Sequence, residues 1–271
     1  MSKNSFWKMV GIGAGVAIGI YLMREYIQKK KAFLGNFSPL IDHVDITTDG
    51  VLTERWVFHW DDEERCRRAT QLKLDSMGNV TGRKHQVFDF FDERIEVLTY
   101  LDDEATPDDV SYLLLNELDV VTSIVHRSKG GQEERWDTTI NGAELAQITN
   151  EDTTATMYWH EGNLEGISYD GDARVKMTYY KDKENYVFPD INLFINGFDI
   201  ELLMTYLMGT RSRHFLRTRV TTGANYHQQC HISYLLDSFD RPIQVLIEET
   251  ELSNDISTNS SREFDITYKK I

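Results

Sequence analysis

Apolar and polar residues alternate along most of the chain after residue 50. In residues 55–60, Trp56, Phe58 and Trp60 occupy every second position, which places three aromatic side chains on one face of a β-strand. Runs of this kind recur roughly every 8–12 residues with polar turn residues between them, a spacing typical of an antiparallel meander. Predicted strands in the second half lie at 134–140, 143–149, 154–160, 164–169, 173–180, 214–221 and 229–236.

The alternation stops once, and a helical insertion is predicted at about 189–209. Asp199 can cap a helix that begins at Ile200, and Gly209 can end it. The apolar residues between them fall on one helical face. We expect this insertion to pack across an open side of the sheet or to fill its interior.

Residues 9–23 carry no charge. With flanking residues the apolar segment covers 6–27, which is long enough to cross a bilayer as a transmembrane helix. A cleaved signal peptide is the alternative, although no small-x-small site ends the segment. Gly11, Gly15 and Gly19 fall on one helix face, a spacing that allows close helix packing and a homo-oligomer. A generic glycine-rich anchor explains the same pattern.

These segments predict three parts: a membrane anchor with a basic flank at 1–31, a connector at 32–50, and an antiparallel β domain at 51–271. The net charge is −15, and residues 1–31 carry six Lys or Arg against one Glu. The remaining chain therefore carries about −20, which disfavours nucleic acid as a partner. The basic flank after the anchor mildly favours a cytoplasmic β domain.

One basic patch interrupts the acidic domain directly after the predicted helix. We expect it either to hold an anionic ligand or acidic partner or to neutralise nearby carboxylates. The patch consists of Arg211, Arg213, His214, Arg217 and Arg219.

No catalytic, cofactor or metal site is predicted. His227 and His231 share a strand face but lie about 13 Å apart, and Cys230 points the other way. The phosphate-binding loop, the nucleophile elbow and the zinc-binding H-E-x-x-H motif are all missing from the sequence. Cys66 and Cys230 remain compatible with one disulfide or with two buried thiols.

Repeated turn units carry a resemblance. Residues 74–80, 169–175 and 236–243 resemble YD-type hairpin repeats, and their combination with residues 189–193 and 202–209 is similar to an uncharacterised family of Gram-negative envelope proteins with a porin-like fold. The resemblance covers roughly residues 44–271. It implies a strongly curved antiparallel sheet and an envelope location, with no catalytic residues. Members of that family typically carry a lipid-modified Cys near the N-terminus, whereas this chain has an apparent transmembrane anchor there. This difference weakens the implication that the β domain is exported.

The predicted fold is therefore all-β, a strongly curved antiparallel meander of half-barrel shape with one helical insertion, preceded by an N-terminal transmembrane helix. The predicted function is a non-enzymatic, single-pass envelope protein that binds an apolar, glycan or peptide ligand or a protein partner, and the resemblance implies a periplasmic β domain. Two alternatives stay open, an envelope-polymer hydrolase with an Asp/Glu pair and a structural subunit of a membrane assembly. A lipid-facing barrel is disfavoured because strands such as 93–100 are too charged.

Overall fold

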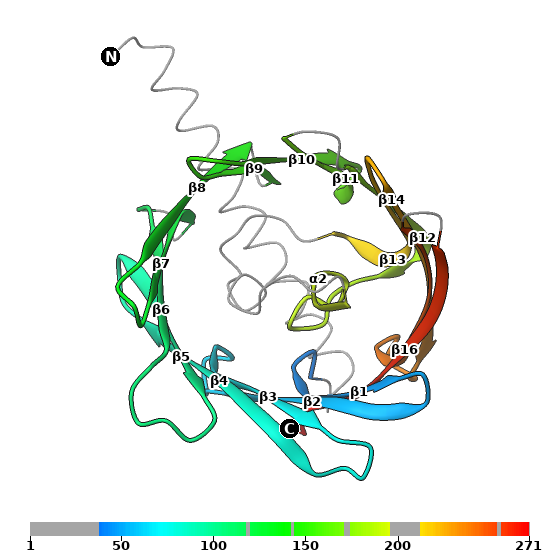
Figure 1. Cartoon of the computed structure of the whole chain (residues 1–271), viewed down its shortest axis with the longest axis horizontal. Helices are drawn as coiled ribbons and strands as arrows, with labels where there is room; N and C mark the ends of the chain where they lie inside the picture. Colours follow the sequence, from blue (N-terminus) through cyan, green and yellow to red (C-terminus); the bar gives the residue numbers. More distant parts are fainter. Residues whose placement is uncertain are drawn as a thin grey trace.

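The computed structural model describes residues 38–117, 120–141, 144–170, 174–195, 212–253 and 256–270. Within these ranges the chain forms a closed antiparallel barrel of 16 strands in sequence order and one short helix (Figure 1). The strands are β1 (Ile41–Thr48), β2 (Val51–Trp60), β3 (Cys66–Leu74), β4 (Val80–Phe90), β5 (Arg94–Leu101), β6 (Asp109–Leu115), β7 (Val121–Ser128), β8 (Glu133–Asn141), β9 (Glu144–Thr149), β10 (Thr154–His160), β11 (Asn163–Tyr169), β12 (Arg174–Glu184), β13 (His214–Gly223), β14 (Tyr226–Leu236), β15 (Pro242–Ser253) and β16 (Ile256–Tyr268). The helix is α2 (Ile191–Ile195).

Pairing of β1 with β16 closes the barrel, from Ile41 opposite Tyr268 to Thr48 opposite Arg262. β1 also pairs with β2, so neither the first nor the last strand leaves a free edge. The predicted open half-barrel sheet is therefore wrong. Its error lies at residues 41–48, which were assigned to the connector 32–50 although they form the strand that closes the sheet.

Several predictions fall on residues outside the described ranges. They concern the anchor at 6–27 with Gly11, Gly15 and Gly19, and the helix at 200–208. Across the residues that the structure does describe, no helix combines the length and the apolar character needed to cross a bilayer.

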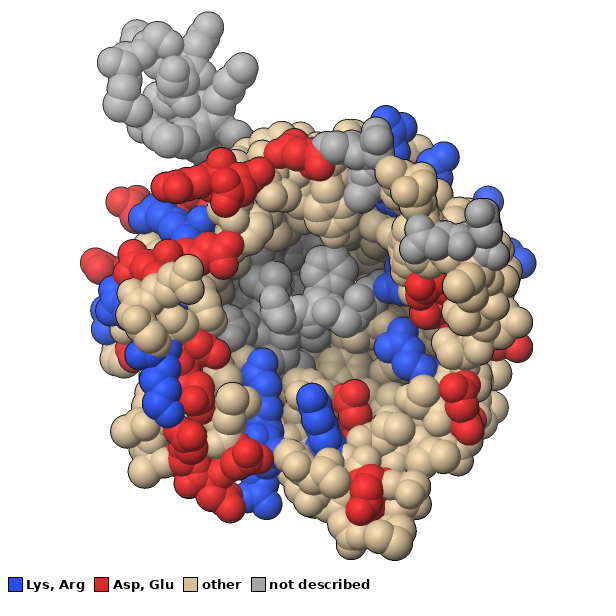
Figure 2. Space-filling model, viewed as in Figure 1, with Lys and Arg blue, Asp and Glu red and all other residues tan. Residues whose placement is uncertain are grey.

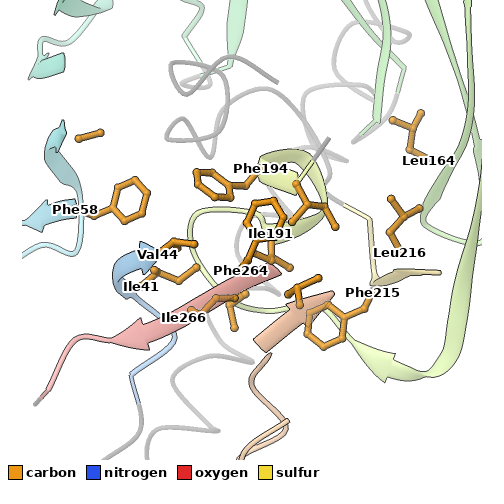
Figure 3. Packing of buried hydrophobic residues seen from close by; sticks show 14 of the residues in the cluster. Ile41, Val44, Phe58, Leu164, Ile191, Phe194, Phe215, Leu216, Phe264 and Ile266 are labelled. Atoms are coloured by element: carbon orange, nitrogen blue, oxygen red, sulfur yellow. The ribbon is translucent and has the colours of Figure 1, made fainter. Parts of the chain in front are cut away.

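Buried apolar side chains fill one end of the barrel around α2. The ring of Phe194 lies edge-on to three rings of the wall, with centroids 5.8 Å from Trp56, 6.2 Å from Phe58 and 6.2 Å from Phe264. Figure 3 shows side chains from both edges of the β1–β16 closure converging on the helix. Because each fully buried side chain of this size contributes about 1.5–3 kcal/mol, α2 acts as an internal plug that holds the wall together.

A buried carboxylate starts this helix. Asp190 Oδ1 accepts hydrogen bonds from the backbone N–H of Asn192 at 3.0 Å and from Asn185 Nδ2 at 2.7 Å. The backbone N–H of Phe194 donates to the Asp190 carbonyl at 2.9 Å. Asp190 is thus the N-cap residue of α2, and it fixes the angle at which the plug enters the barrel.

The outer face of the wall carries charged side chains among its apolar ones. On β16, the exposed Asp265 lies between the buried Phe264 and Ile266, and Glu96 occupies the equivalent position on β5. Ion pairs on this face join Arg55 to Asp45, Arg127 to Glu133 and Arg135 to Asp137. A lipid-facing barrel has the opposite pattern, an uncharged apolar band outside and polar groups inside.

The wall is irregular at one place. β13 pairs with β14 only from Gly223 opposite Tyr226 to Thr218 opposite His231, whereas β14 continues along β15 as far as Leu236. The first residues of β13 turn into the barrel towards α2 (Figure 1). We call the resulting gap between residues 214–217 and 232–236 the seam.

Tyr180 of β12 covers part of the seam. Its hydroxyl donates to the Ile232 carbonyl at 2.9 Å, and its ring lies edge-on to Tyr234 with centroids 5.9 Å apart. The β12–β13 register shifts between Tyr179 and Glu184, which displaces this part of β12 from its normal pairing and lets Tyr180 reach β14.

Three hairpin turns share one geometry in which an Asp carboxylate accepts hydrogen bonds from the backbone N–H groups two and four residues later. The turns begin at Asp61, Asp75 and Asp237. In each, the fourth residue has a left-handed φ, between 60° and 82°. Such turns fix the register of the strands that they join.

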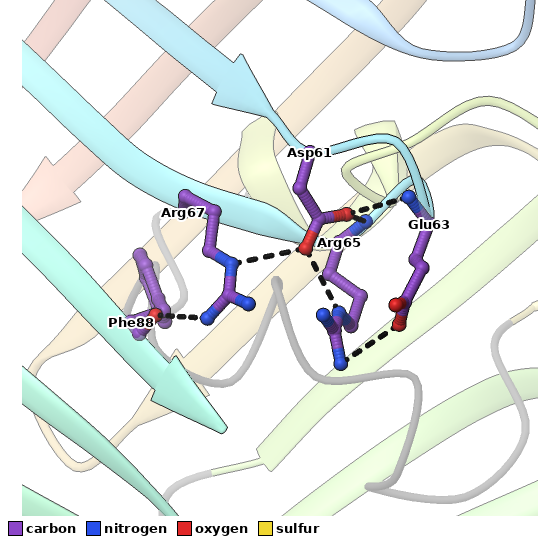
Figure 4. Close-up of polar contacts among 5 residues, drawn as sticks. All are labelled: Asp61, Glu63, Arg65, Arg67 and Phe88. Atoms are coloured by element: carbon purple, nitrogen blue, oxygen red, sulfur yellow. Dashed lines mark hydrogen bonds and ion pairs between the residues drawn. The ribbon is translucent and has the colours of Figure 1, made fainter.

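The Asp61 turn is the most heavily bonded of the three (Figure 4). Both Arg65 and Arg67 donate from Nε to Asp61 Oδ2 at 2.9 Å. Arg67 also donates to the Phe88 carbonyl at 3.4 Å, which connects the β2–β3 turn to β4.

Candidate ligand-binding site in the barrel mouth

The half of the barrel away from α2 has a polar inner face. The inward positions there carry charged residues of both signs, including Glu54, Lys84, Asp109, Arg219, Glu249 and Arg262. Figure 2 looks down the barrel axis and shows a central hollow with Lys, Arg, Asp and Glu side chains around it. We call this half of the interior the mouth.

A group of polar side chains from β13, β14, β15 and β16 converges in the mouth. Strand register places Arg219 opposite Cys230, and Cys230 opposite Glu249. These positions face inward because Ile232 and Ile247, two residues further along the strands, belong to the apolar core. We call the group the mouth cluster: Arg219, Gln228, Cys230, Glu249 and Arg262.

Arg219 is the centre of the mouth cluster. Its Nη2 donates to Gln228 Oε1 at 2.9 Å and to Cys230 Sγ at 3.3 Å, and lies 3.8 Å from Glu249 Oε2. Arg262 Nη2 approaches the same Glu249 oxygen at 3.7 Å. Only 14% of the Arg219 side chain and 16% of the Glu249 side chain are exposed, so water screens this pair less than it screens ion pairs on the outer face.

Two tyrosines and a second carboxylate lie beside the cluster. Tyr226 and Glu251 continue the inward positions of β14 and β15, and Tyr169 faces inward from β11 next to Ile167. Burial raises the pKa of both phenols, and the charge of Arg219 opposes that shift in each case. Arg219 therefore lies within electrostatic range of both rings.

Cys230 has the chemistry of a buried thiol. Burial raises its pKa above the usual value, the charge of Arg219 lowers it, and that of Glu249 raises it. Cys66 is likewise free and buried, and burial raises the pKa of its thiol to about 12. Of the two possibilities left open by the sequence, the structure shows two unpaired thiols.

The basic patch expected from the sequence is divided between two places. Arg211 lies outside the described residues, Arg213 and Arg217 lie at the seam, and Arg219 belongs to the mouth cluster. Each described arginine has an acidic or aromatic neighbour: Arg213 lies 3.6 Å from Glu184, and Arg217 lies over the Tyr180 ring. The structure does not bring the patch together as one anion site.

His214 has a structural place next to the plug. Its backbone N–H donates to Asn163 Oδ1 at 3.0 Å, and its Nδ1 lies 3.1 Å from Asn163 Nδ2. Burial and then the charge of Arg213 lower its pKa, while Glu184, Asp182 and Glu161 oppose that shift. The imidazole is therefore neutral at pH 7, which makes it a poor anion ligand.

The seam itself borders two small cavities. One of about 380 Å³ is lined by residues 181–184 and 213–214 with Tyr186, Leu236 and Asp240. The other, of about 220 Å³, lies between Tyr180, Arg217 and residues 231–233, with Glu248 at its side. Basic and acidic side chains alternate around both, so neither has a dominant charge.

Sequence reasoning missed Gln228, Glu249 and Arg262 as members of a site. The β14–β15 turn at 237–241 is recognisable in the sequence, and counting back along both strands from it places Cys230 near Glu249. The partnership of Arg219 with that pair needs the β13–β14 register as well. The aromatic residues that were prominent in the sequence, such as Phe58 and Phe88, are core residues at the opposite end.

Comparison with solved structures shows the fold class. The chain is similar to a structure described as a porin-like protein from Bacteroides uniformis ATCC 8492, with a TM-score of 0.65 and 12% sequence identity over 86% of this chain and 98% of that chain. The fold is porin-like. At this level of identity the likeness concerns the fold alone.

Comparisons of the sequence alone identify no relative. No family model matches it, and a search of curated proteins also finds no match. The porin-like fold implied by the resemblance is therefore confirmed, whereas the envelope family and its YD-type repeat gain no support from these comparisons.

Proposed function

We propose that this protein is a non-enzymatic cell-envelope protein that binds a ligand in the mouth of its barrel. The proposal is based on how the polarity of the inward-facing side chains changes along the barrel. They form an apolar core around α2 at one end and line a hollow with charged and polar groups at the other. Charged groups facing one another across an interior space are costly unless water or a ligand solvates them. The porin-like fold supports the envelope location.

The outer wall argues for a binding protein rather than a lipid-embedded pore. Each Arg or Lys at the midplane of a lipid-facing barrel wall costs roughly 2–4 kcal/mol. The outer face here carries Arg55, Arg127 and Arg135 together with Glu96 and Asp265. We infer that the wall faces water and that the envelope association does not depend on it.

The arrangement of carboxylates also weighs against the hydrolase alternative. Glu249 and Glu251 share the inward face of β15 about two residues apart, roughly 7 Å along the strand. A hydrolase of this type needs one carboxyl kept protonated as the acid and a second one as base or nucleophile. Glu249 is instead held between two guanidinium groups, those of Arg219 and Arg262.

Native mass spectrometry of the full chain, isolated from the envelope fraction of its own cells, tests the proposal. We expect a non-protein mass bound to the wild type. The variant Gly223→Trp should abolish it, since position 223 faces inward opposite Tyr226, and a Cβ there would meet only Tyr226 Cβ, at 3.8 Å.

Thr222→Trp is the matched control, because the neighbouring residue points to the outer face. Retention of the bound mass in Thr222→Trp and its loss in Gly223→Trp place the ligand in the mouth. A wild-type protein that fractionates outside the envelope, or a bound mass indifferent to Gly223→Trp, contradicts the proposal.

A further inference from the structure

We propose that the mouth cluster, with Tyr169 and Tyr226, is a binding site for an uncharged oligosaccharide. This inference rests on the proposed function and specifies the ligand of the same site. It follows from three features of the site: the balance of its charges, the geometry of its polar groups and the presence of two aromatic rings.

The charges balance within the site. Arg219 and Arg262 both lie within 3.8 Å of Glu249, and Glu251 adds a second carboxylate on the same face. Two cations thus face two anions. An anionic ligand would have to displace Glu249 from both guanidinium groups, and a cationic ligand would meet the same two arginines, so neither charge is favoured.

The polar groups are planar and present several hydrogen-bonding atoms each. A guanidinium group donates several hydrogen bonds in one plane, and a carboxylate accepts hydrogen bonds on two oxygens. The Gln228 amide both donates and accepts. Neighbouring hydroxyl groups of a sugar ring both donate and accept at a spacing that such groups match. An apolar ligand would leave these polar atoms without partners, at a cost of roughly 1–3 kcal/mol each.

The two tyrosines supply the remaining element. Strand register aligns Ser168 of β11 with His227 of β14 through Arg174 and Thr222, so the adjacent inward residues Tyr169 and Tyr226 lie at the same level of the barrel. The negative face of an aromatic ring attracts the C–H groups on the flat face of a pyranose, and each phenol hydroxyl adds a polar contact. A site that combines planar hydrogen-bonding groups with aromatic rings and has no net charge fits a neutral saccharide best.

Isothermal titration calorimetry of the full chain tests the inference with five probes: cellohexaose, N-acetylchitohexaose, laminarihexaose, maltohexaose and the anionic hexagalacturonate. We expect at least one neutral hexasaccharide to bind, and to bind more tightly than hexagalacturonate. Tyr226→Ala should weaken that binding at least tenfold.

Tyr158→Ala is the matched control, because Tyr158 is 55% exposed on the outer face, where it pairs with Gly166. It should leave the affinity unchanged. Gln228→Ala serves as a second test in case Tyr226→Ala folds poorly, since it removes one hydrogen bond to Arg219 at a half-buried position. It should also weaken binding.

Three results would overturn the inference: no neutral hexasaccharide binds, hexagalacturonate binds more tightly, or binding is the same in both mouth variants as in the wild type. These outcomes are separable from failure of the proposed function. A non-protein mass that disappears in Gly223→Trp, combined with no saccharide binding, keeps the mouth as the binding site and rejects the ligand class. If no bound mass depends on Gly223 and no saccharide binds, the mouth is rejected as a binding site.

Discussion

The side chain of Asn192 pairs with the backbone around Leu216 as a neighbouring strand would. The Leu216 N–H donates to Asn192 Oδ1 at 2.8 Å, and Asn192 Nδ2 donates to the His214 carbonyl at 2.8 Å. One amide on the plug thus satisfies the edge that β13 exposes where it leaves β14. The plug and the interrupted wall are consequently one structural unit.

Replacing Asn192 with Leu keeps the size of the side chain but removes both hydrogen bonds. Two backbone groups, one buried and one partly buried, then lose their partner at about 1–3 kcal/mol each, so we expect the free energy of unfolding to fall by roughly 2–6 kcal/mol. Urea unfolding followed by tryptophan fluorescence measures the change. Asn259→Leu, at an exposed position of β16, is the control and should unfold close to the wild type.

Arg241 connects three parts of the chain at the plugged end. Its Nη2 lies 2.7 Å from Asp237 Oδ2, its Nη1 donates to the Ser38 carbonyl at 2.6 Å, and its guanidinium lies 4.2 Å from the centre of the Tyr268 ring. The side chains of Arg241 and Asp237 are only 13% and 17% exposed. Arg241→Met leaves Asp237 without its cation, and we expect a loss on the order of 3 kcal/mol in unfolding free energy.

The corresponding change on the outer face is Arg127→Met. Arg127 and Glu133 pair at 2.7 Å but are 52% and 51% exposed, so water screens their attraction. We expect little measurable change in thermal unfolding. Equal effects of the two substitutions would show that burial does not govern the strength of these pairs.

Asp61 should make stability depend on pH. Burial raises the pKa of its carboxyl, but hydrogen bonds from Arg65 and Arg67 together with the charge of Arg65 outweigh burial, so the folded pKa lies below 3.8. Its stabilisation is present above the unfolded pKa and disappears as the pH falls through the folded pKa. Chemical unfolding between pH 6 and pH 2.5 should show that loss below about pH 4.

Asp61→Asn removes this titration. We expect the variant to be less stable than the wild type at pH 6 and to approach it at pH 2.5. The neighbouring Asp62→Asn is the control, since Asp62 is exposed and its removal leaves the Asp61 turn intact. A pH dependence that survives Asp61→Asn unchanged would assign it to other carboxylates.

Cys66 should resist alkylation in the folded protein. Burial raises the pKa of its thiol to about 12, and only the thiolate reacts. At pH 8 we expect iodoacetamide to modify Cys66 only after urea unfolding, as read by peptide mass spectrometry. Rapid modification of the folded protein at pH 8 would show that β3 opens locally.

The inward carboxylates Glu249 and Glu251 should not cleave a bound saccharide. Glu249 contacts the guanidinium groups of both Arg219 and Arg262, so it is not placed as a free acid–base partner for Glu251. Chromatography of each neutral hexasaccharide after prolonged incubation with the protein should recover it at full length. Shortened products that disappear in Glu249→Gln and Glu251→Gln would establish the hydrolase instead.

Part of this architecture could be predicted from local residues. The alternation through Trp56, Phe58 and Trp60 indicated both the strand and its buried face, because a strand repeats every two residues whatever its neighbours are. The turns at Asp75 and Asp237 were recognisable because Asp bonds to its own backbone and left-handed φ angles favour particular residues. These features depend on a few adjacent residues only.

The mouth cluster could not be predicted in the same way. Regular alternation would put Arg219 on the same face as Arg213 and Arg217, but the register shift opposite Tyr179 and the inward turn of β13 separate them. Its true partners, Glu249 and Arg262, come from other strands, and their positions follow from the sum of several registers. A shift of one residue in any of those strands would turn these side chains to the outer face.

By itself, the sequence determined the antiparallel strands, most of their turns and which face of many strands is apolar, because hydrophobic period and turn chemistry are local. Only the tertiary structure decided that the sheet closes, that α2 plugs one end, and that the charged inward positions gather at the other. Closure depends on Ile41 meeting Tyr268, a pairing of distant residues that forms only when every register and the tilt of all the strands agree.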